Sequence, residues 1–169
     1  VKTKVTIDKD GCMVVENASK VGTTGTFKVA AGSIHIRNAT IDVTVASGAT
    51  LASDSNDVTT IDGKLTIEGT VTVANEQTIT AKKDVVVKGT LAVADANDSK
   101  NAGIFEVQGK LYIGLTSDDV TGDAASVSGA ITGVSVAFVK ADATISDATL
   151  DSFKVDGVLK STTYVVEGK

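Results

Sequence analysis

Residues 61–73 alternate between two kinds of position. The odd positions hold apolar residues or glycine, and the even positions hold polar residues. Because successive side chains of a strand point to opposite faces, this pattern predicts β-structure with one dry face and one wet face. Gly63 and Gly69 fall on the dry face, where a missing side chain permits a bend or the close approach of another backbone.

The centre of this stretch, an apolar-x-Gly-x-apolar motif, returns along the chain. Its later copies are Val87–Leu91, Val107–Leu111, Val127–Ile131 and Val155–Leu159. The central glycines are Gly63, Gly89, Gly109, Gly129 and Gly157. The motif thus returns after roughly 20–28 residues, a period that suits one coil of a β-solenoid.

The sequence therefore predicts an all-β fold, a β-solenoid or a stack of β-arches with coils of about 20–28 residues. A β-sandwich is the alternative, since strands at this spacing also fit that fold. We expect one domain over residues 1–169, with an irregular first part (1–57) and a repeat region (58–169), because terminal coils usually differ from the middle. Helix signals are weak, and only Asp142 to Phe153 allows a short amphipathic helix. The expected core residues are Ile61, Leu65, Ile67, Val71, Val73, Val87, Leu91, Val93, Val107, Leu111 and Ile113.

The composition adds one unusual feature, the complete absence of proline. Average usage would give roughly eight prolines in a chain of this length. Proline removes a ladder hydrogen bond, and natural sheets use it to blunt their edges. Its absence is compatible with uninterrupted ladders and with edges that pair with another chain.

Charge and hydropathy exclude two classes of partner. The formal net charge is −5, and the chain has a single arginine, Arg37, and no basic run. Binding along a phosphate backbone requires clustered Lys and Arg, so we expect no nucleic-acid partner. No stretch approaches the roughly 20 apolar residues of a membrane-spanning helix, so we expect no membrane span.

The first residue and the cysteine content bear on localisation. The chain begins with Val1 rather than Met, as expected of either a processed product or an excised fragment. Removal of a signal peptide would explain this and predicts an extracellular, cell-surface location. The single cysteine, Cys12, cannot form an intramolecular disulfide, so it is either a small buried residue or part of an intermolecular disulfide.

Two loops share the pattern Asp-x-Asn-Asp. Carboxylate and amide oxygens clustered in a loop are the ligands that calcium requires. The same residues favour turns through hydrogen bonds to their own backbone, which is the competing interpretation. Calcium is the only cofactor that the sequence suggests. The candidate ligands are Asp54, Asn56, Asp57, Asp95, Asn97 and Asp98.

Catalytic signals are absent from the sequence, so we expect no enzyme activity and name no catalytic residue. His35 is the only histidine and has no obvious partner for acid–base chemistry. Asp118, Asp119 and Asp123 lie together in an acidic loop, whereas glycoside hydrolysis needs two carboxylates that converge across a groove. Three Asn-x-Ser/Thr sequons are candidate glycosylation sites in an exported chain, namely Asn17, Asn38 and Asn97.

Repeats such as Val87-x-Gly89-x-Leu91-x-Val93 resemble the coils of extracellular prokaryotic β-solenoid surface proteins. These include adhesin stalks, S-layer-associated proteins and, most similar here, the amyloid-like sheath proteins of filamentous methanogenic archaea. The resemblance is one of pattern and composition and covers roughly residues 27–166. It implies a structural role without catalytic residues.

The function that we expect is a structural subunit of an extracellular sheath, fibre or surface layer, polymerised by β-pairing between edge strands of copies of the same chain. The first and last strands are the candidates for these contacts, with residues Val1, Thr3, Val5, Ile7, Tyr164, Val165 and Val166. The alternative is an adhesin or carbohydrate-binding module of a cell-surface protein, with the loops 95–101 and 118–123 as its surface.

Overall fold

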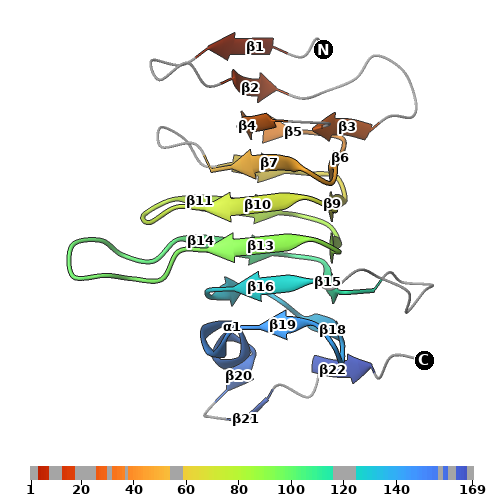
Figure 1. Ribbon diagram of the computed structural model, residues 1–169, viewed down its shortest axis with the longest axis vertical. Helices are drawn as coiled ribbons and strands as arrows, with labels where there is room; N and C mark the ends of the chain where they lie inside the picture. Colours follow the sequence, from red (N-terminus) through yellow and green to blue (C-terminus); the bar gives the residue numbers. More distant parts are fainter. Residues whose placement is uncertain are drawn as a thin grey trace.

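The computed structural model describes residues 4–7, 13–17, 26–29, 32–36, 38–53, 59–115, 125–155, 158–159 and 163–166. The polypeptide winds through three sheets, here named A, B and C, and from residue 26 onward it visits them in the repeating order C, A, B (Figure 1). The result is a β-solenoid of about four turns. This architecture confirms the predicted solenoid in preference to the β-sandwich.

Each sheet runs along the stack of coils. Sheet A contains β1 (Lys4–Ile7), β2 (Met13–Asn17), β4 (Gly32–Ile36), β7 (Ala49–Ala52), β10 (Thr70–Val73), β13 (Thr90–Val93), β16 (Ser126–Ser128) and β19 (Thr144–Ile145). Sheet B contains β5 (Asn38–Ala39), β8 (Thr59–Ile61), β11 (Thr78–Ala81), β14 (Ile104–Val107) and β17 (Ile131–Thr132). Sheet C contains β3 (Thr26–Val29), β6 (Asp42–Val45), β9 (Leu65–Ile67), β12 (Val85–Val87), β15 (Lys110–Ile113), β18 (Val136–Lys140) and β22 (Thr163–Val166). The other elements are the helix α1 (Asp147–Ser152) and the hairpin of β20 (Lys154–Val155) and β21 (Val158–Leu159).

The register of the parallel strands gives the length of each coil. One column of sheet C contains, in consecutive coils, Val43, Leu65, Val85 and Leu111. The steps between these positions agree with the predicted coil length of about 20–28 residues. The first described coil is shorter than the later ones, since Phe27 is already paired with Val43.

The core lies between the three sheets and follows directly from the alternating pattern. Strands such as β10 show alternating half-buried and buried positions, because every second side chain points into the solenoid. All eleven core residues expected from the sequence are buried, and none is more than 4% exposed. Each large aliphatic side chain buried in this way contributes roughly 1.5–3 kcal/mol to folding.

The glycine motif marks the corners between sheets, where neighbouring coils come very close. A Cβ atom on Gly89 would collide with the carbonyl oxygen of Gly69 in the preceding coil and would lie 2.6 Å from that of Glu68. A Cβ on Gly109 would likewise collide with the backbone of Lys83. Glycine is required at these corners because only a residue without a side chain permits this approach.

The copies of the motif do not all mark the same corner. Gly69 and Gly89 lie between sheets C and A, Gly63 and Gly109 lie between sheets B and C, and Gly129 lies between sheets A and B. The stretch from Gly89 to Gly109 therefore covers two sides of a coil plus a loop rather than one complete coil. Gly157 lies outside the described residues.

We expect Gly89→Ala to lower the free energy of unfolding by about 1–3 kcal/mol, because the new methyl group overpacks the corner. Gly48→Asn is a matched control, since Gly48 has a φ of 80° and a Cβ atom placed there would have no other atom within 4 Å, and Asn tolerates this backbone region. Urea unfolding of both variants measures the difference. Equal stability of the two variants would contradict the close approach at the corner.

Candidate functional site

The end strands expected to mediate self-association lie at opposite ends of the stack (Figure 1). Val5 and Ile7 belong to β1, which is the terminal strand of sheet A and pairs antiparallel with β2. Tyr164, Val165 and Val166 belong to β22, which is the terminal strand of sheet C and pairs parallel with β18. Val1 and Thr3 lie outside the described residues.

At the C-terminal end, sheet B is closed by α1 rather than by another described strand. The helix begins after the N-cap Ser146, whose hydroxyl also accepts a hydrogen bond from the Gly129 amide at 3.1 Å. The Thr149 hydroxyl donates to the Gly129 carbonyl, and the Ser152 hydroxyl accepts from the Ile131 amide at 3.2 Å. Hydroxyl groups at every third position therefore satisfy the backbone around the last strand of this sheet, which removes a pairing edge.

Sheet C differs from sheet B in that its two ends are alike. Its terminal strands, β3 and β22, are each four residues long, and every described pair from one to the other is parallel. The two strands therefore run in the same direction. No further described strand follows either of them in the sheet.

Charged residues stack in columns of alternating sign. Asp42, Lys64, Asp84 and Lys110 occupy equivalent positions of consecutive coils at the start of the sheet C strands. The Asp42 carboxylate accepts a hydrogen bond from the Lys64 amide at 2.8 Å, and Asp84 accepts from the Lys110 amide at 2.9 Å. These bonds join neighbouring coils at one edge of sheet C.

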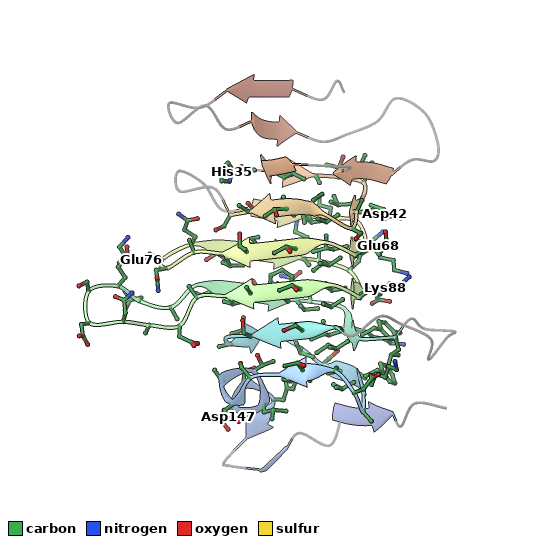
Figure 2. The ribbon with its side chains drawn as sticks, viewed as in Figure 1. His35, Asp42, Glu68, Glu76, Lys88 and Asp147 are labelled. Carbon is green, nitrogen blue, oxygen red and sulfur yellow. The ribbon has the colours of Figure 1, made fainter. Side chains whose placement is uncertain are left out.

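Two ion pairs repeat this arrangement, one at the same corner between sheets B and C and one at the corner between sheets C and A. The Lys82 ammonium lies 2.8 Å from an Asp62 carboxylate oxygen of the preceding coil, and Lys88 lies 4.0 Å from Glu68. Figure 2 shows Glu68 and Lys88 on neighbouring coils at one edge of the stack. Such exposed pairs contribute only about 0–1 kcal/mol each, so their main effect is to avoid stacking like charges.

A second apolar cluster lies on the outer face of sheet C. It contains Val86, Tyr112 and Leu115, which are at most 7% exposed, with the partly buried Phe138 packed against them. The rings of Tyr112 and Phe138 stack with centroids 5.0 Å apart and an interplanar angle of 9°. Sequence reasoning missed this cluster, because its members come from different coils and face away from the main core.

The outer face of sheet A contains small and hydroxylated residues. One column holds Thr50, Thr70, Thr90, Ser126 and Thr144. Six strands of sheet A contain no Asp, Glu, Lys or Arg, namely β4, β7, β10, β13, β16 and β19.

His35 is half-buried in β4 of the same sheet. Its Nδ1 donates to the Ala52 carbonyl of the next coil at 3.0 Å, since a carbonyl oxygen can only accept. The only histidine of the chain is therefore engaged in a contact between coils.

The calcium candidates Asp95, Asn97 and Asp98 lie in the loop 94–103 between β13 and β14. Asn97 Oδ1 accepts hydrogen bonds from the amides of Ser99 and Lys100, both at 3.0 Å, which is the geometry of an Asx turn. The side chain of Asn75, in the preceding coil, donates to the carbonyls of Asp95 and Asn101 at 2.7 and 3.0 Å. The turn and this anchor account for the positions of both asparagines, and calcium binding stays a prediction.

The remaining candidate residues do not gather at one place. Asn17 lies in β2, Asn38 is half-buried in β5, and Asn97 is exposed in its loop. The other candidates lie outside the described residues, namely Asp54, Asn56, Asp57, Cys12, Asp118, Asp119 and Asp123.

No concentration of reactive side chains is present in the described ranges. Within them, no group of three or more His, Cys, Asp or Glu residues is arranged to hold a metal ion. None of the described helical residues forms a helix long and apolar enough to cross a membrane.

Comparisons with protein-family models, curated proteins and solved structures find no match. The solenoid architecture expected from the resemblance is confirmed, whereas kinship with sheath proteins rests on pattern alone.

Two buried threonines differ in whether their hydroxyl groups form a hydrogen bond. Thr59 and Thr149 are both fully buried. The Thr149 hydroxyl donates to Gly129, whereas the Thr59 hydroxyl has no hydrogen-bond partner in the part of the chain that the structure describes. We expect Thr149→Val to lower the free energy of unfolding by about 1–3 kcal/mol, because the Gly129 carbonyl loses its partner.

The same substitution at Thr59 should have the opposite sign. Thr59→Val removes a buried hydroxyl that has no hydrogen-bond partner among the described residues, so we expect stability to rise by about 1 kcal/mol. Thermal and urea unfolding of the two variants, compared with the unmodified chain, measure both effects. Destabilisation by Thr59→Val equal to that of Thr149→Val would contradict the assignment of the two hydroxyls.

Proposed function

We propose that this chain is a non-enzymatic structural subunit of an extracellular assembly at the cell surface. The assembly is a sheath, fibre or surface layer, and copies of the chain are its building blocks. The subunits join through main-chain hydrogen bonds between the terminal strands of neighbouring solenoids. We call such a joint amyloid-like, because the backbone hydrogen-bond ladder continues from one chain to the next.

One observation carries the proposal, namely that the described ladders of sheets A and C end in the strands β1 and β22 at opposite ends of the stack. A terminal strand presents N–H and C=O groups that can pair with another chain. Proteins that stay monomeric usually protect such edges with proline, charge or a covering element. This chain contains no proline, and the contacts of α1 described above protect sheet B.

The geometry of the two ends favours an open polymer. The surfaces at the two ends of the solenoid differ, so a joint between them is heterologous. A heterologous joint that does not close into a ring produces a filament. An elongated stack of in-register coils is suited to this role, because its long axis is already the direction of the ladder.

Paired proline variants in β22 test the proposal. In a strand, successive N–H groups point to opposite sides. One of the variants Tyr164→Pro and Val165→Pro therefore removes an amide that faces β18, and the other removes an amide that faces away from it. We expect the variant that loses the outward-facing amide to keep the melting temperature of the monomer and to abolish assembly. Negative-stain electron microscopy from dilute to concentrated solution, with the unmodified chain as reference, measures assembly.

The unmodified chain should form fibres, hoops or sheets as its concentration rises. Dispersed single particles at every concentration would contradict the proposed function. Assembly that survives both proline variants would show that β22 is not part of the joint.

The alternative function, an adhesin or carbohydrate-binding module, is favoured by the loop 94–103. This loop connects β13 to β14, whereas the shorter segment 74–77 makes the equivalent connection from β10 to β11 one coil earlier. The longer loop projects from the side of the stack (Figure 1), and Asn75 holds it against the preceding coil. Projecting loops on a rigid scaffold are common binding surfaces.

Calcium titration separates the two functions. A calcium-stabilised module gains stability by mass action, about 2.7 kcal/mol when calcium is at about 100 times its dissociation constant. The module therefore requires a calcium-dependent rise in melting temperature that disappears in the double variant Asp95→Asn, Asp98→Asn and persists in the control Asp147→Asn. A melting temperature that does not respond to calcium would remove the support for this alternative.

A further inference from the structure

The three sheets offer very different ends for a joint between copies. Among the described residues, sheet B is closed at its C-terminal end by the hydroxyl contacts of α1, and at the other end it has only the two-residue strand β5. Sheet A ends in β1, which runs against the direction of its neighbour, and in β19, which has two residues. Of the described sheets, only sheet C has four-residue strands at both ends that run in the same direction.

The columns of sheet C extend without a break from one end to the other. The column that begins at Val29 continues through Val45, Ile67, Val87, Ile113 and Val139 to Val165. Its interior members, from Val45 to Val139, are at most 6% exposed. The adjacent column begins at Lys28 and ends at Tyr164. The end strands thus occupy equivalent register positions, and both ends of the first column are valine.

We propose that β22 of one copy pairs in parallel with β3 of the next copy, with Tyr164 opposite Lys28 and Val165 opposite Val29. Sheet C then runs through successive copies as one continuous parallel sheet. This inference rests on the proposed function and specifies which strands make the joint. The partner is a second copy of the chain, because its β3 has the direction, length and column register that an added strand requires.

This joint differs in one strand from the expectation drawn from the sequence. The sequence pointed to the first strand and the last strand as the two contacts, whereas this joint uses β3 in place of β1. Pairing of β22 with β1 would join strands of two different sheets and would interrupt the columns of both. The parallel joint instead continues the columns of sheet C, whereas sheet A extends beyond β4 by the strands β2 and β1 and is not continued by it.

Disulfide cross-linking between two single-cysteine variants tests the register. In a Cys12→Ser background, Lys28→Cys and Tyr164→Cys each leave one cysteine per chain. Neighbouring parallel strands are about 4.8 Å apart, and a disulfide joins Cα atoms about 4.4–6.8 Å apart. The two variants are mixed in equal amounts under mild oxidation, at a concentration where microscopy shows assemblies.

We expect the mixture to give at least tenfold more covalent dimer than either variant alone, because a head-to-tail joint brings unlike ends together. A mixture of Thr6→Cys and Tyr164→Cys probes the competing joint with β1. If that mixture forms cross-links and the mixture of Lys28→Cys and Tyr164→Cys does not, the β3–β22 joint is overturned and the proposed function still stands. Dimers formed by one variant alone would also overturn it, since they require a two-fold symmetric contact.

The experiment separates failure of this joint from failure of the proposed function. Assemblies that are visible by microscopy but form no cross-link in either mixture contradict the β3–β22 joint only. Absence of both assemblies and cross-links contradicts the joint and the structural role together. The melting temperature of each variant, measured in parallel, confirms that the cysteine substitutions leave the fold intact.

Discussion

Parallel stacking in register places each residue of a coil beside its counterpart in the next coil, about 4.8 Å away. The core, the charged edges and the glycine corners all follow from this stacking. Inside the solenoid it produces apolar columns such as the one from Val45 to Val139. At the edges it would stack like charges, and the chain instead alternates acidic and basic residues, as at Asp42 and Lys64. At the corners it brings backbones so close that a Cβ atom on Gly89 has no room.

The same constraint makes the ends of the stack different from its middle. Every interior coil has its backbone groups satisfied by the coils on both sides, but a terminal coil has a neighbour on one side only. The chain solves this for sheet B with Ser146, Thr149 and Ser152, whose hydroxyl groups replace the missing strand. Sheet C has no comparable element among the described residues, and its end strands match each other in direction and length. This asymmetry between capped and uncapped sheets connects the fold to a structural role.

Much of the fold could be predicted from the sequence, because alternation along a strand is a local property. The buried positions from Ile61 to Ile113 follow from that alternation. The spacing of the glycine motif indicated coils of about 20–28 residues, although successive copies of the motif mark different corners. The corner that each glycine occupies could not be predicted, since Gly89 and Gly109 have the same local motif but lie at different corners. The outer cluster around Tyr112 likewise depends on loop lengths that set the register between coils.

The candidate site was less predictable than the fold. The sequence identified the end strands as candidate contacts, and β1 and β22 are indeed the terminal strands of their sheets. It did not predict that α1 caps one sheet, because this requires knowing that Ser146 and Ser152 lie beneath Gly129 and Ile131. The Asp-x-Asn-Asp pattern around Asn97 marked a loop correctly, but calcium ligands and turn residues have the same composition.

In the proposed assembly, the coils of successive copies stack along the axis of the fibre. X-ray diffraction from oriented assemblies measures the direction of this stacking. We expect the strand-spacing reflection at about 4.8 Å to lie along the fibre axis. The same reflection perpendicular to that axis would contradict the stacking of copies end to end.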